Sequence, residues 1–84
     1  MDEELTAEDL QAIEARFEAA SPGPWRSLIE GREQMSGSSF IMTGGPDIYL
    51  SGATDPDHDF IAAARQDVPR LIREIRRLRT AASK

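Results

Sequence analysis

The stretch DPDHDFIAAARQDVPRLIREIRRLRT, residues 55–80, decides the fold, because it decides how the final third of the chain is built. Its apolar residues recur at the spacing of an α-helix. Pro69 interrupts the pattern, since a proline is tolerated in the first turn of a helix but not in its interior. We therefore expect a short helix over residues 57–65, a break at 66–68, and a longer helix over 69–81 capped by Asp67. One kinked helix is the alternative.

Acidic side chains and the only histidine of the chain open this stretch, and such clusters bind metals as well as begin helices: Asp55, Asp57, His58 and Asp59. The alternating aspartates resemble the start of a calcium loop, but the sixth and twelfth positions lack the Gly and Glu that such a loop needs. A transition metal would need further imidazole or thiolate ligands, and the chain has one histidine and no cysteine. We therefore expect no metal and no cofactor.

The same residue types fit the start of a helix without any ligand. Asp55 is the expected cap, and Pro56 suits the first helical position, where the amide hydrogen that it lacks would be unpaired. Asp57 and Asp59 would then lie near the positive end of the helix dipole. The acidic cluster is therefore interpreted as structural.

Another helix is expected near the N-terminus, over residues 7–20. Thr6 and Asp9 have the spacing of a capping box, and Leu10, Ile13 and Phe17 recur on one face. The sequence SPGPW, residues 21–25, ends this helix, because its prolines cannot continue the backbone hydrogen bonding and its glycine permits a turn.

The middle of the chain is rich in residues that favour strands. WRSLIE (25–30), SFIMT (39–43) and DIYLS (47–51) each predict a short strand. The GGP at 44–46 predicts a hairpin turn, and REQMSGSS (32–39) predicts a polar loop. The sheet would have two or three antiparallel strands, and a sheet this small needs a helix on one face.

These elements define an α+β fold in one small domain of residues 1–84, with residues 1–5 and 82–84 frayed. The N-terminal helix, the meander and two C-terminal helices, or one kinked helix, would pack on one face of the sheet. The expected core consists of Leu10, Ile13, Phe17, Trp25, Leu28, Phe40, Met42, Ile48, Leu50, Phe60, Ile61, Ala64, Leu71, Ile72 and Ile75.

The net charge of −5 is unevenly placed along the chain. Residues 1–34 carry nine acidic residues and three arginines, whereas residues 65–84 carry seven basic and two acidic residues. Nucleic acid is disfavoured as a partner because phosphate binding needs a net positive surface, although the basic segment leaves a local contact open. The sequence has no run approaching the roughly 20 apolar residues of a membrane span and no signal peptide, so the expected location is the cytoplasm.

The basic C-terminal segment holds the candidate interaction surface: Arg70, Arg73, Arg76, Arg77, Leu78 and Arg79. A heptad seam with 3,4,3,4 spacing runs along the same segment and comprises Val68, Leu71, Ile75, Leu78 and Ala82. Three interpretations remain open. The segment is a core helix whose arginines are solvated or pair with acids such as Glu14, a homodimer seam, or a nucleic-acid contact.

The position of Leu78 separates the first two interpretations. This side chain would either cover the first helix near Phe17 or meet a second chain. We favour the cover within one chain, because the acidic first helix complements the charge of Arg76 and Arg79.

Two segments resemble a family of short phage- and prophage-encoded proteins that includes the Ead-like accessory proteins: AASPGPW (19–25) and DFIAAARQDVPRLIREI (59–75). Members combine a Thr/Ser-Pro-Gly-Pro-Trp-like turn with an Asp-x-x-Phe-Ile-Ala-Ala-Ala helix, and SSFIMTGGPDIYLSG (38–52) lies outside the match. The resemblance implies that Trp25 and Phe60 are core partners. It also implies a mobile-element context and an accessory role without catalytic residues.

The expected function is that of a small, non-enzymatic protein-interaction module, an inhibitor or adaptor of a host or phage protein. The main alternative is a small nucleotide- or nucleic-acid-binding domain that uses the arginine-rich helix. Catalysis ranks third, because a Ser–His–Asp arrangement would need His58 held against a serine.

Overall fold

The computed structural model describes residues 4–82 of the 84-residue chain. Its elements are α1 (Ala7–Ala19), β1 (Arg26–Leu28), β2 (Phe40–Met42) and α2 (Asp55–Ala82). An α+β fold with an N-terminal helix and an antiparallel sheet is therefore confirmed. Of the residues expected to be frayed, 1–3, 83 and 84 lie outside the described part.

The C-terminal third forms one helix instead of two. α2 has 28 residues and continues through Pro69, so the break expected at residues 66–68 is wrong and a single helix replaces it. Asp67 lies inside this helix, 3.7 Å from Arg70, and does not cap a second one. Ala62 and Ile72 are buried on one side of α2, before and after the proline. An uninterrupted helix keeps both in one buried stripe, which favours continuity despite the backbone donor lost at Pro69.

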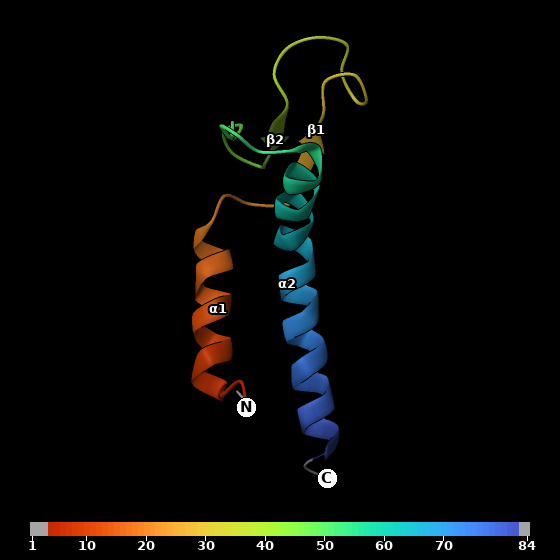
Figure 1. The fold of residues 1–84 in the computed structure, drawn as a ribbon. Coiled ribbons are helices and arrows are strands. Elements are labelled where there is room, and N and C mark those ends of the chain that lie inside the picture. The colour runs from red at the N-terminus through yellow and green to blue at the C-terminus, as the bar shows by residue number, and fades with distance from the viewer. Residues whose placement is uncertain (1–3, 83–84) are drawn as a thin grey trace.

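α1 lies alongside the C-terminal half of α2 and runs antiparallel to it, whereas the two strands lie at the N-terminal end of α2 (Figure 1). At 1.5 Å per residue, α2 is about 42 Å long and α1 about 20 Å. Among the named elements, α1 contacts α2 alone, so the expected packing of all helices on one face of the sheet is wrong. The molecule is elongated, with extents of 54 × 28 × 19 Å.

The sheet has two strands, with Ser27 opposite Ile41. Within residues 4–82, the third expected strand is reduced to a single bridge. Ile48 exchanges backbone hydrogen bonds of 2.8 and 2.9 Å with Ile41, and no further pairing extends it into a strand. The intervening turn docks on the turn that follows α1, where the Gly44 amide donates to the Pro22 carbonyl at 2.7 Å. A Cβ at position 44 would lie 2.8 Å from that oxygen, so this approach requires glycine.

The buried apolar residues within 4–82 are Leu10, Ile29, Ile41, Ala62 and Ile72. The expected core is confirmed at Leu10 and Ile72, and most of its other members are half-buried. Three members are wrongly placed, because 40% of Met42, 74% of Phe60 and 61% of Leu71 is exposed.

The wrong prediction that Met42 of β2 is buried is explained by the alternation of side chains along a strand. Ile41 is fully buried, so its two neighbours in the strand must face the other way. Phe40 there stacks on Tyr49, with ring centroids 5.2 Å apart.

Gln66 fastens the turn between α1 and β1 to α2. Its Oε1 accepts from the Trp25 amide at 2.7 Å, and its Nε2 donates to the Trp25 carbonyl at 3.2 Å. One side chain thus satisfies both backbone groups of a residue 41 positions away.

Arg65 reinforces this junction from the neighbouring position. Its Nε donates to the Ser21 carbonyl at 3.2 Å, and its guanidinium lies 5.6 Å from the centre of the Phe17 ring. The implied pairing of Trp25 with Phe60 is not seen, since Phe60 is largely exposed. The two segments that carry the family resemblance meet through Arg65 and Gln66 instead.

Replacing Gln66 with alanine should lower the free energy of unfolding by about 1–3 kcal/mol, because it leaves both backbone groups of Trp25 without their partner. Urea unfolding followed by Trp25 fluorescence measures the change. Gln11→Ala, an equivalent substitution at an exposed position of α1, is the matched control. An equal loss in the two variants would contradict a special role for Gln66.

Candidate functional site

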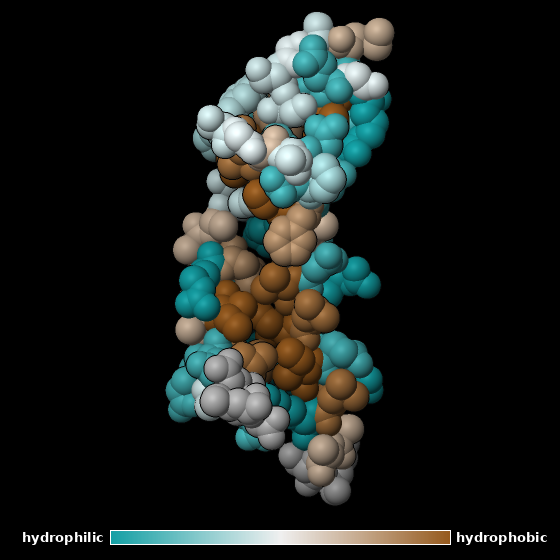
Figure 2. Space-filling model, in the orientation of Figure 1, coloured by the Kyte–Doolittle hydropathy of each residue, from teal (hydrophilic) through white to brown (hydrophobic). Residues whose placement is uncertain are grey.

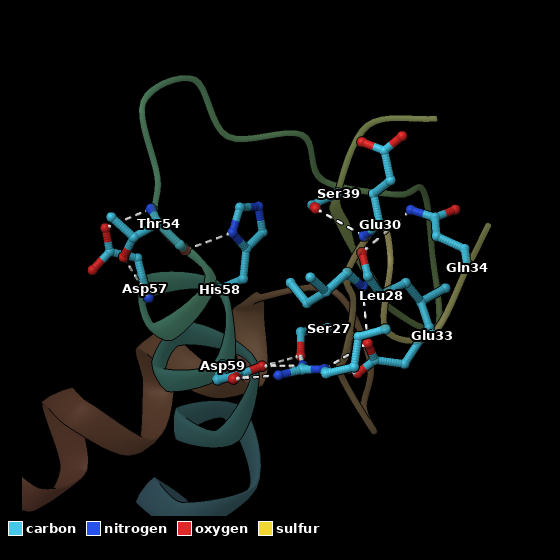
Figure 3. A network of polar contacts seen from close by, with 12 residues as sticks. Ser27, Leu28, Glu30, Glu33, Gln34, Ser39, Thr54, Asp57, His58 and Asp59 are labelled. Carbon is cyan, nitrogen blue, oxygen red and sulfur yellow. Dashed lines mark hydrogen bonds and ion pairs between the residues drawn. The ribbon is translucent and has the colours of Figure 1, made fainter. Parts of the chain in front are cut away.

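The acidic cluster at the start of α2 builds a helix cap, one residue earlier than expected. Thr54, not Asp55, is the cap: its Oγ1 accepts from the Asp57 amide at 3.2 Å, and Asp57 Oδ2 accepts from the Thr54 amide at 3.0 Å (Figure 3). These bonds form a capping box like that of Thr6 and Asp9 in α1, which is confirmed. They lower the pKa of Asp57, with the bond from the Thr54 backbone as the larger cause.

Asp59 points away from this cap, towards the loop that follows β1 (Figure 3). Its Oδ1 accepts from the Ser27 hydroxyl at 2.5 Å and from Arg32 Nη2 at 2.7 Å, and its Oδ2 accepts from Arg32 Nη1 at 3.1 Å. The bonds from Arg32 and then Ser27 lower the pKa of Asp59 to about 2. A carboxylate that the sequence assigned to the helix dipole therefore joins α2 to β1 and the loop.

The loop itself is held by bonds among its own residues. Glu33 Oε2 accepts from the Ile29 amide at 3.2 Å, while the Gly31 amide donates to the Gln34 carbonyl at 2.7 Å. Gln34 Nε2 donates to the Ser38 carbonyl at 2.8 Å. The polar loop expected from the sequence is confirmed, and Arg32 anchors it to α2 through Asp59.

His58 is 3% exposed and has no catalytic arrangement within residues 4–82. Its Nδ1 lies 2.9 Å from the Thr54 carbonyl and donates to it, because a carbonyl oxygen only accepts. Its Nε2 has no hydrogen-bond partner in the described residues. The histidine is therefore not paired there with a serine, as nucleophilic catalysis would require.

The donor set does not converge on a metal either. Asp57 is engaged by Thr54, and Asp59 is engaged by Arg32 and Ser27. Within residues 4–82, no three His, Asp or Glu side chains are grouped as metal ligands.

The candidate interaction surface divides between two sides of α2. Arg76 faces α1, where its Nη1 and Nη2 each lie 3.1 Å from a carboxylate oxygen of Glu14. Arg79 donates to the Leu5 carbonyl near the start of α1. The expected pairing with Glu14 is confirmed for Arg76, and these two arginines hold the helices together.

Arg70, Arg73 and Arg77 lie on the exposed side of α2. Arg77 Nη2 lies 2.6 Å from Glu74 Oε2, a contact that lowers the pKa of Glu74, and Arg70 is paired with Asp67. These five side chains have a net charge of only +1. The outward side is therefore a band of mixed charge and not a strongly basic patch.

Apolar side chains form a second row beside this band. We call Val68, Leu71, Ile75 and Leu78 the apolar stripe. Leu71 is 61% exposed and Leu78 52% exposed, while Val68 and Ile75 are half-buried. Figure 2 shows the apolar face gathered over α1 and the C-terminal half of α2. The preferred location of Leu78 over Phe17 is wrong, because Phe17 lies beside Arg65 and half of Leu78 is uncovered.

No family model, no curated protein and no solved structure matches the chain. In the part from residue 4 to residue 82, neither helix is long and apolar enough to cross a membrane.

Stability should depend on the protonation of Asp59. Its folded pKa of about 2 lies below the ordinary value of 3.8, so the unfolded chain binds more protons between these values. The stabilisation by Asp59 is then complete above about pH 5 and is lost as the pH falls towards 2. Asp59→Asn should lower stability at pH 7, and the difference from the native chain should vanish near pH 2.

Chemical unfolding at pH 7, 4, 3 and 2 checks this expectation. Asp47→Asn removes the same charge from an exposed position between β2 and α2 and is the matched control. A native–variant difference that stays constant from pH 7 to pH 2 would show that the Asp59 carboxylate does not contribute through its charge.

Proposed function

We propose that this chain is a small, non-enzymatic protein-interaction module and that the apolar stripe of α2 is its contact surface. The observation that carries the proposal is the exposure of Leu71 and Leu78, 61% and 52%, in one row along a helix. Covering such side chains with another protein removes apolar area from water, which stabilises the complex by about 25 cal/mol per Å² of buried area. Contiguous apolar surface bordered by polar residues is typical of interaction sites.

The charged residues beside the stripe fit the border of an interface. Asp67 pairs with Arg70, and Glu74 pairs with Arg77, along the outer edge. Protein interfaces commonly have an apolar centre and a polar rim, and the rim fixes orientation more than it adds affinity. An apolar row next to paired charges therefore suits a protein partner.

The biological role follows from the resemblance to Ead-like proteins. An accessory protein of a phage or prophage would act in the cytoplasm as an inhibitor or adaptor of a host or phage protein. The two segments of the resemblance, the Ser21–Trp25 turn and the residues after Asp59, contact each other through Gln66.

Nucleic-acid binding by the arginines is the weaker alternative. Arg76 is engaged by Glu14, Arg77 by Glu74, and Arg70 by Asp67. Phosphate would have to displace these carboxylates, and the remaining positive charge is small. A surface that neutralises few phosphates gives weak binding that salt removes.

Photocrosslinking tests the proposed contact surface. A benzophenone amino acid at position 71, introduced in cells that naturally express the chain, should give discrete protein adducts. The same residue at position 35 is the control, because Met35 is 95% exposed but lies in the loop between β1 and β2. Adducts from position 35 with none from position 71 would contradict the proposal.

A gel-shift titration with single- and double-stranded oligonucleotides tests the alternative. We expect no complex at low salt, since the exposed arginines are largely paired. A complex that weakens with salt, and that Arg70→Gln with Arg73→Gln and Arg77→Gln abolishes, would favour nucleic-acid binding instead.

A further inference from the structure

We propose that an extended segment of a partner protein binds this chain as an additional β-strand, along the backbone of residues 47–50. We call this backbone the open edge of the sheet. The proposal goes beyond the contact surface on α2, because it concerns a different part of the molecule and a different kind of contact. It is carried by the backbone groups of the open edge, by its strand-like side-chain pattern, and by the obstruction of the opposite edge.

The open edge presents unpaired hydrogen-bonding groups on one side. Ile48 directs both its amide and its carbonyl towards Ile41 of β2. In an extended chain the backbone groups of adjacent residues point in opposite directions, so those of Asp47 and Tyr49 point away from the sheet. Within residues 4–82, the amides and carbonyls of these two residues have no hydrogen-bond partner. Such a row of donors and acceptors is complementary to another extended backbone.

The same segment already has the side-chain alternation of a strand. Ile48 and Leu50 are half-buried, whereas Asp47 and Tyr49 are exposed, with 63% of Tyr49 uncovered. The Tyr49 ring stacks on that of Phe40 in β2, with centroids 5.2 Å apart, which fixes the segment against the sheet. Little of the chain therefore has to be ordered when a neighbouring strand is added, and this lowers the entropic cost of binding.

The opposite edge of the sheet, along β1, is closed to an added strand. The amide and carbonyl of Trp25 are bound by the Gln66 side chain. The amide and carbonyl of Ile29 are bound within the loop that follows β1. Side chains and loops that cover an edge in this way are a common protection against unwanted pairing. Among the residues from 4 to 82, nothing covers residues 47–50 by hydrogen bonding on their outer side, so this is the edge available to a partner.

The side chains of the open edge define the kind of segment that fits it. A residue paired with Tyr49 would lie beside its ring, where β-branched and aromatic side chains contribute most. The residue two positions away would be paired with Asp47, an exposed carboxylate with no ion pair in the described part of the chain. Opposite charges stabilise such cross-strand pairs. The fitting segment therefore has a lysine or arginine two positions from a β-branched or aromatic residue.

Amide hydrogen exchange of the full chain with a designed peptide tests the proposal. The probe is the capped peptide Thr-Lys-Thr-Val-Thr-Val-Thr, in which lysine and a valine have the required spacing. With saturating peptide, the amides of Asp47 and Tyr49 should exchange more than about tenfold more slowly, because they become hydrogen-bonded. The Trp25 amide is the internal control and should keep its rate, since it lies on the closed edge.

Matched peptides separate strand addition from other kinds of binding. N-methylation of the lysine and the central valine removes the amide donors that face the open edge, and this peptide should give no protection. N-methylation of the two neighbouring threonines leaves those donors in place, and this peptide should still protect both amides. Asp47→Arg should weaken binding of the lysine peptide and strengthen binding of a peptide with glutamate in its place.

The proposal is overturned if the unmethylated peptide leaves the exchange of Asp47 and Tyr49 unchanged. Protection that persists with the peptide methylated on lysine and valine overturns it as well. Protection that rises with the concentration of the chain alone assigns the open edge to a second copy and overturns a separate partner. These outcomes are independent of the contact surface on α2, which crosslinking from position 71 tests.

Discussion

The paired hydrogen bonds between the Gln66 amide and the backbone of Trp25 are the contact on which the rest of the fold depends. The turn before Trp25 contains Pro22 and Pro24, which have no amide hydrogen to donate, so it cannot organise itself by backbone bonding alone. α2 supplies the missing partners through Gln66 and Arg65. This junction fixes where the chain leaves α1, and it thereby sets α1 antiparallel beside α2 with the sheet at one end.

The exposed surface is a direct consequence of that junction. Because α1 has 13 residues and is held to α2 by Arg65 at one end and by Arg76 and Arg79 at the other, it covers one side of a much longer helix. Ile72 of that helix is buried, while Leu71, one position earlier, remains exposed. The geometry that buries Ile72 thus also leaves Leu71 and Leu78 of the apolar stripe more than half exposed within residues 4–82.

Local sequence patterns predicted the structural features that depend on nearby residues. They failed for the features that depend on contacts between residues far apart in the sequence. The capping box of Thr6 and Asp9 and the bounds of α1 follow from residues three or four positions apart, so the sequence was sufficient. Thr54 has the same spacing to Asp57 and was recognisable by it. The contact of Asp59 with Arg32 spans 27 positions, and no periodicity reveals it. Which side chains of β2 face inward likewise depends on where α2 lies. The alternating sequence pattern permits two arrangements, shifted by one residue, and does not choose between them.

The candidate surface shows the same limit, since the arginines share one helix but not one environment. Arg76 pairs with Glu14 of α1, whereas its neighbour Arg77 lies in the mixed-charge band and pairs with Glu74. Helical spacing identified the apolar seam, but only the structure shows that Leu71 and Leu78 remain more than half exposed while Val68 and Ile75 are half-buried. A helix that is apolar on more than one side is normally surrounded. The net charge of −5 opposes association in general, yet α2 carries six arginines against five acidic residues, and the band beside the stripe is nearly neutral. Long-range repulsion is therefore weakest where the apolar stripe is exposed.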